Sequence, residues 1–134
     1  MAPLTELPLT HLCLQGCYGI TDFSPLRQTR LTWLNLCRTK MMDLSPLAEL
    51  HLLHLDLRGT RIADLLPLAN VPLRSLDIRF TGIGDVLPLV GMPLEELSFH
   101  PSRLHTGLGR LRVIGTLKTI NRRVAAEFWR KHEC

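Results

Sequence analysis

One motif recurs four times at a fixed spacing, and it limits what this chain can fold into more than any other feature. The segments read "DFSPLRQ", "DLSPLAE", "DLLPLAN" and "DVLPLVG", and their prolines, Pro25, Pro46, Pro67 and Pro88, are each 21 residues apart. A second pattern, L-x-x-L-x-L or a close variant, begins at Leu9, Leu31, Leu52, Leu73 and Leu94. Such a period indicates stacked units, because one unit of this size cannot bury its apolar side alone.

The alternating leucines predict a parallel sheet. Alternation turns the leucines of each strand inward and their neighbours outward, so adjacent strands line one concave face. Only about eight residues remain for the outer side, which leaves room for single helical turns or 3₁₀ pieces. The predicted fold class is α/β: a right-handed leucine-rich repeat solenoid in one domain, residues 1–134. Its units are a partial repeat 1–8, repeats 9–30, 31–51, 52–72 and 73–93, and a last strand with a C-terminal cap over 94–134.

Polar residues recur at two positions of the unit. Thr39, Thr60 and Thr81 follow the strands, and we expect each hydroxyl to hydrogen-bond the turning backbone of the neighbouring coil. Ser24 and Ser45 precede a proline and are predicted N-caps. The repeated aspartates (Asp22, Asp43, Asp64 and Asp85) are expected to accept backbone N–H groups, because one carboxylate per coil is too few for calcium.

The two ends of the chain differ from the repeats. Pro3 lies 22 residues before Pro25, so we expect the chain to begin in the middle of a unit. Its leucines, Leu4, Leu7, Leu9 and Leu12, would then face an open end of the core and are candidates for a self-association interface. The other end, "LRVIGTLKTINRRVAAEFWRKHEC", departs from the repeat. Ala125, Phe128 and Trp129 have helical spacing there and predict a short C-terminal cap helix.

Charge and composition exclude several functions. The net charge of +4 divides into 8 Lys+Arg against 10 Asp+Glu in residues 1–100 (net −2) and 8 against 2 in residues 101–134 (net +6). The basic segment lacks interleaved aromatics, so we expect a solvated cap surface in preference to a nucleic-acid site. No apolar run approaches the roughly 18 residues of a membrane span, and no leader peptide is visible, so we expect a cytoplasmic protein. The four cysteines fit no zinc pattern.

The repeat "LxxLxLxxTxIxDxxPL" resembles the leucine-rich repeats of the internalin-like type. The ending, "MPLEELSFHPSRL" followed by "LKTINRRVAAEFW", resembles the closing segment of leucine-rich repeat proteins common in planctomycete-like bacteria. In those proteins such arrays often follow a serine/threonine kinase domain, but this chain holds neither "HRD" nor "DFG". The resemblance implies a protein-binding scaffold, and no catalytic residues carry over from it.

The outward strand positions form columns across the predicted sheet. Aromatic, arginine, histidine and aspartate side chains are frequent in these columns, and Trp, Tyr and Arg dominate the energetics of protein interfaces. Trp33 and Phe80 are expected to be exposed, with Trp33 as the best candidate anchor, although it could merely cover its neighbours. The candidate partner-binding residues are His11, Trp33, Asn35, His54, Asp56, Arg58, Asp77, Arg79, Phe80, Glu96 and His100.

Several alternatives stay open at these positions. The aspartates and arginines of the columns could neutralise one another, or they could dock a partner with alternating charge. A metal site at His54, Asp56 and Asp77, or nucleophilic catalysis by Cys13 or Cys37, is the least favoured. We therefore predict a non-enzymatic protein-interaction module that acts through its concave face, without cofactor or small-molecule substrate. The alternative is a homo-oligomer assembled through the N-terminal coil.

Overall fold

The chain forms a stack of coils, each with one strand on the inner side and one short turn on the outer side. The structure is a computed structural model, and it describes residues 10–99, 114, 116–121 and 123–124. The repeat units supply five strands: β1 (His11–Cys13), β2 (Trp33–Asn35), β3 (His54–Asp56), β4 (Ser75–Asp77) and β5 (Glu96–Ser98). Each pairs in parallel with the next.

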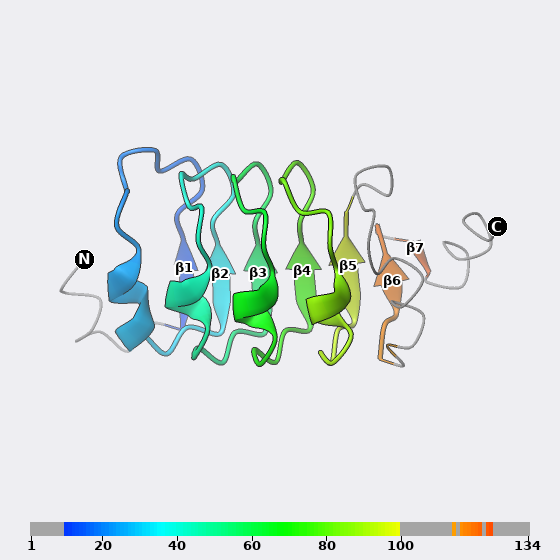
Figure 1. Cartoon of the computed structure of the whole chain (residues 1–134). Coiled ribbons are helices and arrows are strands. Elements are labelled where there is room, and N and C mark those ends of the chain that lie inside the picture. The colour runs from blue at the N-terminus through cyan, green and yellow to red at the C-terminus, as the bar shows by residue number, and fades with distance from the viewer. Residues whose placement is uncertain (1–9, 100–113, 115, 122, 125–134) are drawn as a thin grey trace.

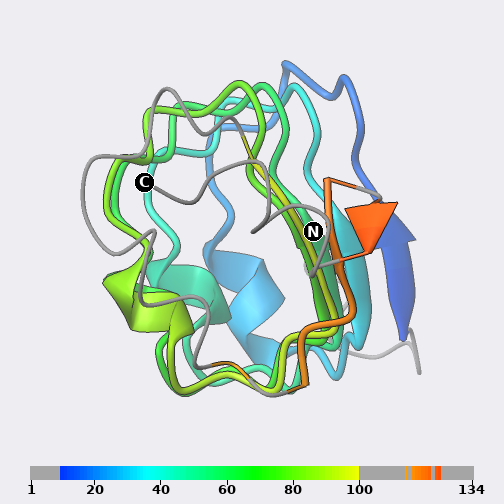
Figure 2. The same cartoon turned by 90° about the vertical axis from the view of Figure 1, so that its right-hand side faces the viewer.

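The outer layer consists of 3₁₀ turns, as the short outer segments predict. These are η2 (Ser24–Gln28), η3 (Ser45–Leu47), η4 (Leu66–Leu68) and η5 (Leu87–Leu89). Figure 1 shows the turns in front of the sheet, and Figure 2, turned by 90°, shows the successive coils superposed as closed loops. The predicted leucine-rich repeat solenoid is confirmed.

The core runs continuously along the stack between the two layers. The central strand leucines lie in register, and their side chains are at most 2% exposed: Leu34, Leu55, Leu76 and Leu97. The leucines that follow the repeated prolines close the core from the outer side and are fully buried: Leu26, Leu47, Leu68 and Leu89. Each coil therefore buries its apolar side against the coils before and after it, as expected for a solenoid.

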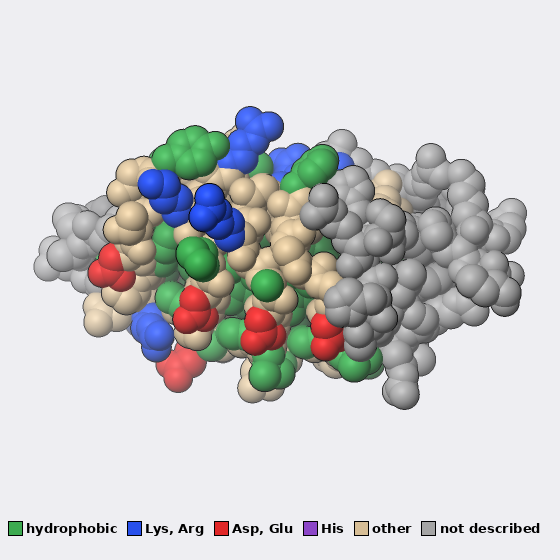
Figure 3. All heavy atoms as spheres, turned by 45° about the horizontal axis from the view of Figure 1, so that its top comes forward, with side chains coloured by type: hydrophobic (Ala, Val, Ile, Leu, Met, Phe, Trp, Pro, Cys, Tyr) green, Lys and Arg blue, Asp and Glu red, His purple; other side chains and the backbone are tan. Residues whose placement is uncertain are grey.

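Each outer turn is fixed by the aspartate that precedes it. Asp22 accepts hydrogen bonds from the backbone N–H of Ser24 (3.0 Å) and from its hydroxyl (2.7 Å), and Asp43 does the same with Ser45. The serines are therefore donors at the first position of the turn, and the prediction that they are N-caps is wrong. Asp64 and Asp85 receive the backbone bond alone, at 2.9 Å. The aspartates form a row along the outer surface (Figure 3).

The threonines after the strands bond within their own coil. Thr39 Oγ1 donates to the carbonyl of Leu36 at 2.9 Å, and Thr60 and Thr81 donate at 2.7 Å to the carbonyl three residues before them. The expected bond to the neighbouring coil is thus wrong. The carbonyl of the first residue after a strand and the hydroxyl three residues later face each other within one turn, whereas the next coil is reached by backbone bonds.

The backbone turns sharply at one position of each coil. Gly16, Arg38, Gly59 and Phe80 occupy equivalent places after β1 to β4, and their φ values are 75°, 58°, 70° and 59°. Glycine is the residue best suited to this left-handed conformation, yet two coils place a large side chain there. Glycine supplies this conformation in the coils after β1 and β3, at Gly16 and Gly59.

The predicted cap region contributes strands. β6 (Thr119–Ile120) pairs in parallel with β5, and β7 (Arg123–Val124) returns antiparallel to β6. The segment that departs from the repeat in sequence therefore extends the sheet, and Asn121, with φ 53°, turns the chain between the two strands. The predicted cap helix at Ala125, Phe128 and Trp129 lies outside the described residues. Among those described, no helix has the length and apolarity needed to cross a membrane.

Candidate functional site on the concave sheet

The register of the strands places the candidate residues in the predicted columns. His11, Trp33, His54, Ser75 and Glu96 are paired from strand to strand, and Thr119 of β6 follows Glu96. Cys13, Asn35, Asp56, Asp77 and Ser98 form the second column in the same way. The two columns lie on the same face because their positions are two residues apart in each strand.

Three rings of the first column form a stack. The ring of Trp33 lies 6.0 Å from the His11 ring, at an interplanar angle of 22°, and 5.2 Å from the His54 ring, at 6°. Trp33 is half-buried between them, although it was expected to be exposed. Adjacent parallel strands hold equivalent side chains at a spacing that suits ring stacking, so each ring covers part of the next.

The second column has a structural role in the turns that follow β2, β3 and β4. A side-chain oxygen of Asn35 accepts the backbone N–H of Cys37 at 2.9 Å, and Asp56 and Asp77 accept those of Arg58 and Arg79 at 3.0 and 3.1 Å. Asn35 and Asp56 are buried. Short polar side chains commonly bond the backbone two residues on, which explains why this column recurs in the sequence.

The two Asp–Arg pairs form a chain of four charges. Arg58 contacts both carboxylate oxygens of Asp56, with Nη2 to Oδ2 at 2.9 Å, and its Nε lies 3.4 Å from Oδ2 of Asp77. Arg79 contacts Asp77 with Nη2 to Oδ2 at 2.8 Å. Hydrogen bonds to these carboxylates raise the pKa of both arginines. The charges in this part of the concave face therefore balance one another, and the paired contacts fix the orientation of these side chains.

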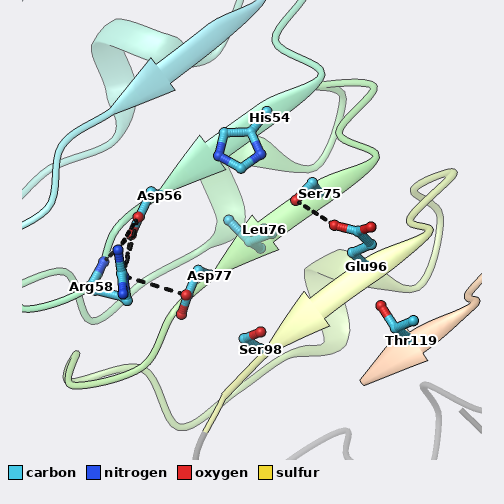
Figure 4. A pocket seen from close by; sticks show the side chains of 9 residues that line it. All are labelled: His54, Asp56, Arg58, Ser75, Leu76, Asp77, Glu96, Ser98 and Thr119. Atoms are coloured by element: carbon cyan, nitrogen blue, oxygen red, sulfur yellow. Dashed lines mark hydrogen bonds and ion pairs between the residues drawn. The ribbon is translucent and has the colours of Figure 1, made fainter. Parts of the chain in front are cut away.

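A hollow of about 370 Å³ lies beside the ring stack (Figure 4). The side chains that border it are His54, Asp56, Arg58, Ser75, Asp77, Glu96, Ser98 and Thr119, with Leu76 at its base. Ser75 Oγ lies 3.5 Å from Oε2 of Glu96. Glu96 is exposed, and within the described part of the chain no cation pairs with it. The hollow therefore combines an aromatic wall with an unbalanced negative charge.

Burial favours the neutral form of His54 where it borders this hollow. Burial lowers the pKa of its imidazole below the ordinary value of 6.5, although the neighbouring carboxylates act in the opposite direction. A neutral imidazole has one donor and one acceptor nitrogen, and its ring stacks on Trp33 without the cost of burying a charge.

Of the other predicted residues, Phe80 and Leu12 do not border this hollow. Phe80 is 62% exposed and lies in the turn after β4. His100, Leu4, Leu7 and Leu9 lie outside the described residues, and Leu12 is half-buried in β1 against the core. Sequence reasoning missed Thr119. The sequence signal that could have found it is the three-residue spacing of Leu117 and Ile120. This spacing repeats the first half of L-x-x-L-x-L and indicates a further strand.

The remaining groups that could carry chemistry are the cysteine thiols, as nucleophiles, and the acidic side chains, as metal ligands. Cys13, Cys17 and Cys37 are free thiols, and burial raises the pKa of Cys37, which favours the unreactive protonated form. Within the described ranges, no group of three or more His, Cys, Asp or Glu side chains is arranged to hold a metal ion.

Comparison with known proteins gives a fold-level match. No protein-family model and no curated protein matches the chain. An internalin (inlF) from Listeria monocytogenes matches with a TM-score of 0.72 and 24% identity, covering 92% of this chain. Internalin C2 (inlC2) of the same species matches with a TM-score of 0.68 and 32% identity over 75% of this chain. The chain spans 44% and 46% of those two structures.

Proposed function

This chain is an internalin-like leucine-rich repeat protein, and from that premise we propose that it is a non-enzymatic module that binds a partner protein on its concave face. The observation that carries the proposal is the stack of His11, Trp33 and His54 beside the hollow that ends at Glu96. A repeat scaffold needs only small or polar residues at these outward positions. Three stacked rings next to a hollow therefore support a role in contact with a partner.

The rings and the hollow have complementary roles in this proposal. Trp33 offers a large, rigid apolar surface, and its two stacked neighbours hold it in one orientation, so little rotamer entropy is lost on binding. The hollow receives a side chain of the partner, and Glu96 favours one that is cationic or donates hydrogen bonds. The four paired charges from Asp56 to Arg79 lie beside the hollow. They fix the orientation of the partner more than they raise its affinity.

The side chains near the hollow support binding in preference to catalysis. Cys37 is buried with a raised pKa, and its backbone N–H is held by Asn35. The carboxylates of Asp56 and Asp77 are held by arginines and by backbone N–H groups, so their oxygens are occupied by structural contacts. Neither group is placed as a nucleophile or base would be.

The test compares three variants of the immobilised chain in a quantitative capture experiment. Trp33→Ala and Glu96→Gln alter the proposed face, while Leu66→Ala alters an outer-surface side chain that is 64% exposed. We expect one or more proteins to be depleted with the first two variants and retained with Leu66→Ala. Calorimetry with the purified partner should give a loss of at least about 2 kcal/mol for Trp33→Ala, as for interface anchors.

Circular dichroism and thermal unfolding show whether each variant keeps the fold. Partner affinity that is unchanged in folded Trp33→Ala and Glu96→Gln, or lost equally in Leu66→Ala, would contradict binding on the concave face. A second replacement, Trp33→Phe, keeps a ring between the two histidines. It should retain most of the affinity if stacking orients the anchor.

A further inference from the structure

A second surface of the molecule lies along the upper edge of the sheet. We use "upper edge" for the turns that follow β1 to β4, residues 14–20, 36–41, 57–62 and 78–83, at the top of Figure 1. Backbone bonds join these turns from coil to coil: Gly16 N–H to Cys37 O (2.9 Å), Arg38 N–H to Arg58 O (2.8 Å) and Gly59 N–H to Arg79 O (3.2 Å). The edge is therefore a continuous ordered strip.

The upper edge carries positive charge that no carboxylate among the described residues balances. Arg38, Lys40 and Arg61 are exposed there, and none of the three pairs with a carboxylate in the part of the chain that the structure describes. Asp56 and Asp77, at the ends of β3 and β4, pair with Arg58 and Arg79. Figure 3 shows lysine and arginine side chains over these turns, and the aspartate row lies lower, on the outer surface.

An apolar hollow lies within this basic strip. It measures about 240 Å³ and is bordered by Cys37, Arg38, Arg58, Gly59 and Phe80. Gly59 keeps it open, because a Cβ at that position would lie 3.2 Å from Cγ of Arg38. Arg38 thus lays its aliphatic stem over the Gly59 backbone and leaves its guanidinium in solvent.

We propose that the upper edge is a second docking surface, for an acidic segment of a protein that inserts one apolar side chain beside Phe80. Charge complementarity selects the acidic segment, and the hollow between the Arg38 stem and Phe80 selects the apolar side chain. This surface shares Arg58 with the concave hollow but contains neither the ring stack nor Glu96.

A polypeptide fits this edge better than a nucleic acid does. Nucleic-acid binding rests mainly on phosphate contacts and weakens steeply with salt, and the described residues of this edge offer three unpaired cations for such contacts. An apolar hollow next to a guanidinium stem also matches an aliphatic side chain more closely than a sugar–phosphate backbone. An acidic peptide gains from both features, because its carboxylates reach the cations while its apolar residue fills the hollow.

The test uses a fluorescein-labelled dodecapeptide of alternating glutamate and glycine with one central leucine. Its binding to the full chain is followed by fluorescence anisotropy at low and physiological salt. The double variant Arg38→Glu/Arg61→Glu should weaken binding at least tenfold. The matched control, Arg27→Glu/Arg30→Glu, changes the same number of charges at exposed sites away from this edge and should stay within twofold.

A second comparison tests the hollow independently of charge. Replacing the peptide leucine by serine should weaken binding three- to tenfold with the wild-type chain and have little effect with Phe80→Asn. Asparagine tolerates the left-handed backbone at this position, so that variant keeps the turn. A coupling between the two changes places the leucine beside Phe80.

Several outcomes would overturn the proposal. These are no saturable binding of the peptide at low salt, equal losses in the two charge-reversal variants, or a serine peptide that binds as well as the leucine peptide. Tighter binding of a single-stranded DNA of equal charge, lost in Arg38→Glu/Arg61→Glu, would assign the edge to nucleic acid instead. Trp33→Ala should leave peptide binding unchanged, so failure here and failure of the concave-face proposal are distinguishable.

Discussion

At the scale of single residues, the aspartate before each outer turn shows how a repeated side chain can be structural. Asp22 and Asp43 are exposed, yet the hydroxyl and the backbone N–H of Ser24 and Ser45 hold the pKa of each carboxyl below its ordinary value of 3.8. The bonds to the serine hydroxyls are the larger cause. A carboxylate that is bonded in the folded state stabilises that state only while it is ionised.

This arrangement predicts a pH dependence of stability. The folded pKa lies below the unfolded one, so the stabilisation is present above the unfolded value of 3.8 and is lost as pH falls through the folded value. Urea unfolding should therefore show a midpoint that falls between about pH 5 and pH 2. The variant Asp22→Asn/Asp43→Asn has no carboxyl to ionise at these positions, so its urea midpoint should fall less over the same pH range.

Ser24→Ala/Ser45→Ala provides the matched comparison. It keeps the carboxylates and their backbone donors but removes the larger cause of the lowered pKa. The decrease of its urea midpoint with falling pH should lie between the decreases of the wild type and of the asparagine variant. Identical pH profiles in all three proteins would show that these carboxylates do not contribute to the acid sensitivity.

At the scale of one element, the turn after each strand is closed by its own threonine. Thr60 is 4% exposed, and its hydroxyl donates to the carbonyl of Leu57 at 2.7 Å. The same carbonyl accepts the backbone N–H of Thr60 at 3.2 Å. The hydroxyl therefore reinforces a tight turn from inside the molecule, where no water can replace it.

Thr60→Val keeps the shape of the side chain and removes this bond. We expect the free energy of unfolding to fall by about 1 kcal/mol, the usual net value of one hydrogen bond. Thr32→Val is the control: its hydroxyl donates to Thr10 at 3.3 Å near the surface, and the loss should stay below about 0.5 kcal/mol. Guanidinium unfolding of both variants measures the difference, and equal losses would contradict a special role for the buried turn.

At the scale of the whole molecule, stability is shared between adjacent coils. Leu55 is fully buried and lies in register with Leu34 on one side and Leu76 on the other. A solenoid has no contacts that link its distant coils, so a defect in one coil weakens both interfaces with its neighbours.

Leu55→Ala should lower the free energy of unfolding by about 2–5 kcal/mol, because it opens a cavity in the continuous core. Hydrogen exchange should show lost protection in β2, β3 and β4 before it reaches the other strands. Leu53→Ala, at a side chain that is 39% exposed, should cost less than about 1 kcal/mol. Loss of protection that is uniform over all strands would show that the stack unfolds as a single unit.

The sequence alone determined the repeat, the parallel strands, the two outward columns and the role of the aspartates. These features were accessible because each depends on contacts within one coil or between adjacent coils. Period and alternation therefore define them without knowledge of the rest of the fold. Leu55 is an example: its place in L-x-x-L-x-L already implies that it faces the core.

Only the tertiary structure decided how outward side chains meet one another. The sequence placed Trp33 between two histidines but could not say that the three rings stack, since that depends on side-chain rotamers and strand spacing. It gave residues 1–100 a net charge of −2. In three dimensions Arg38, Lys40 and Arg61 lie together on the upper edge and the aspartates of the repeated motif lie on the outer surface, because residues about 21 apart in sequence are neighbours across coils.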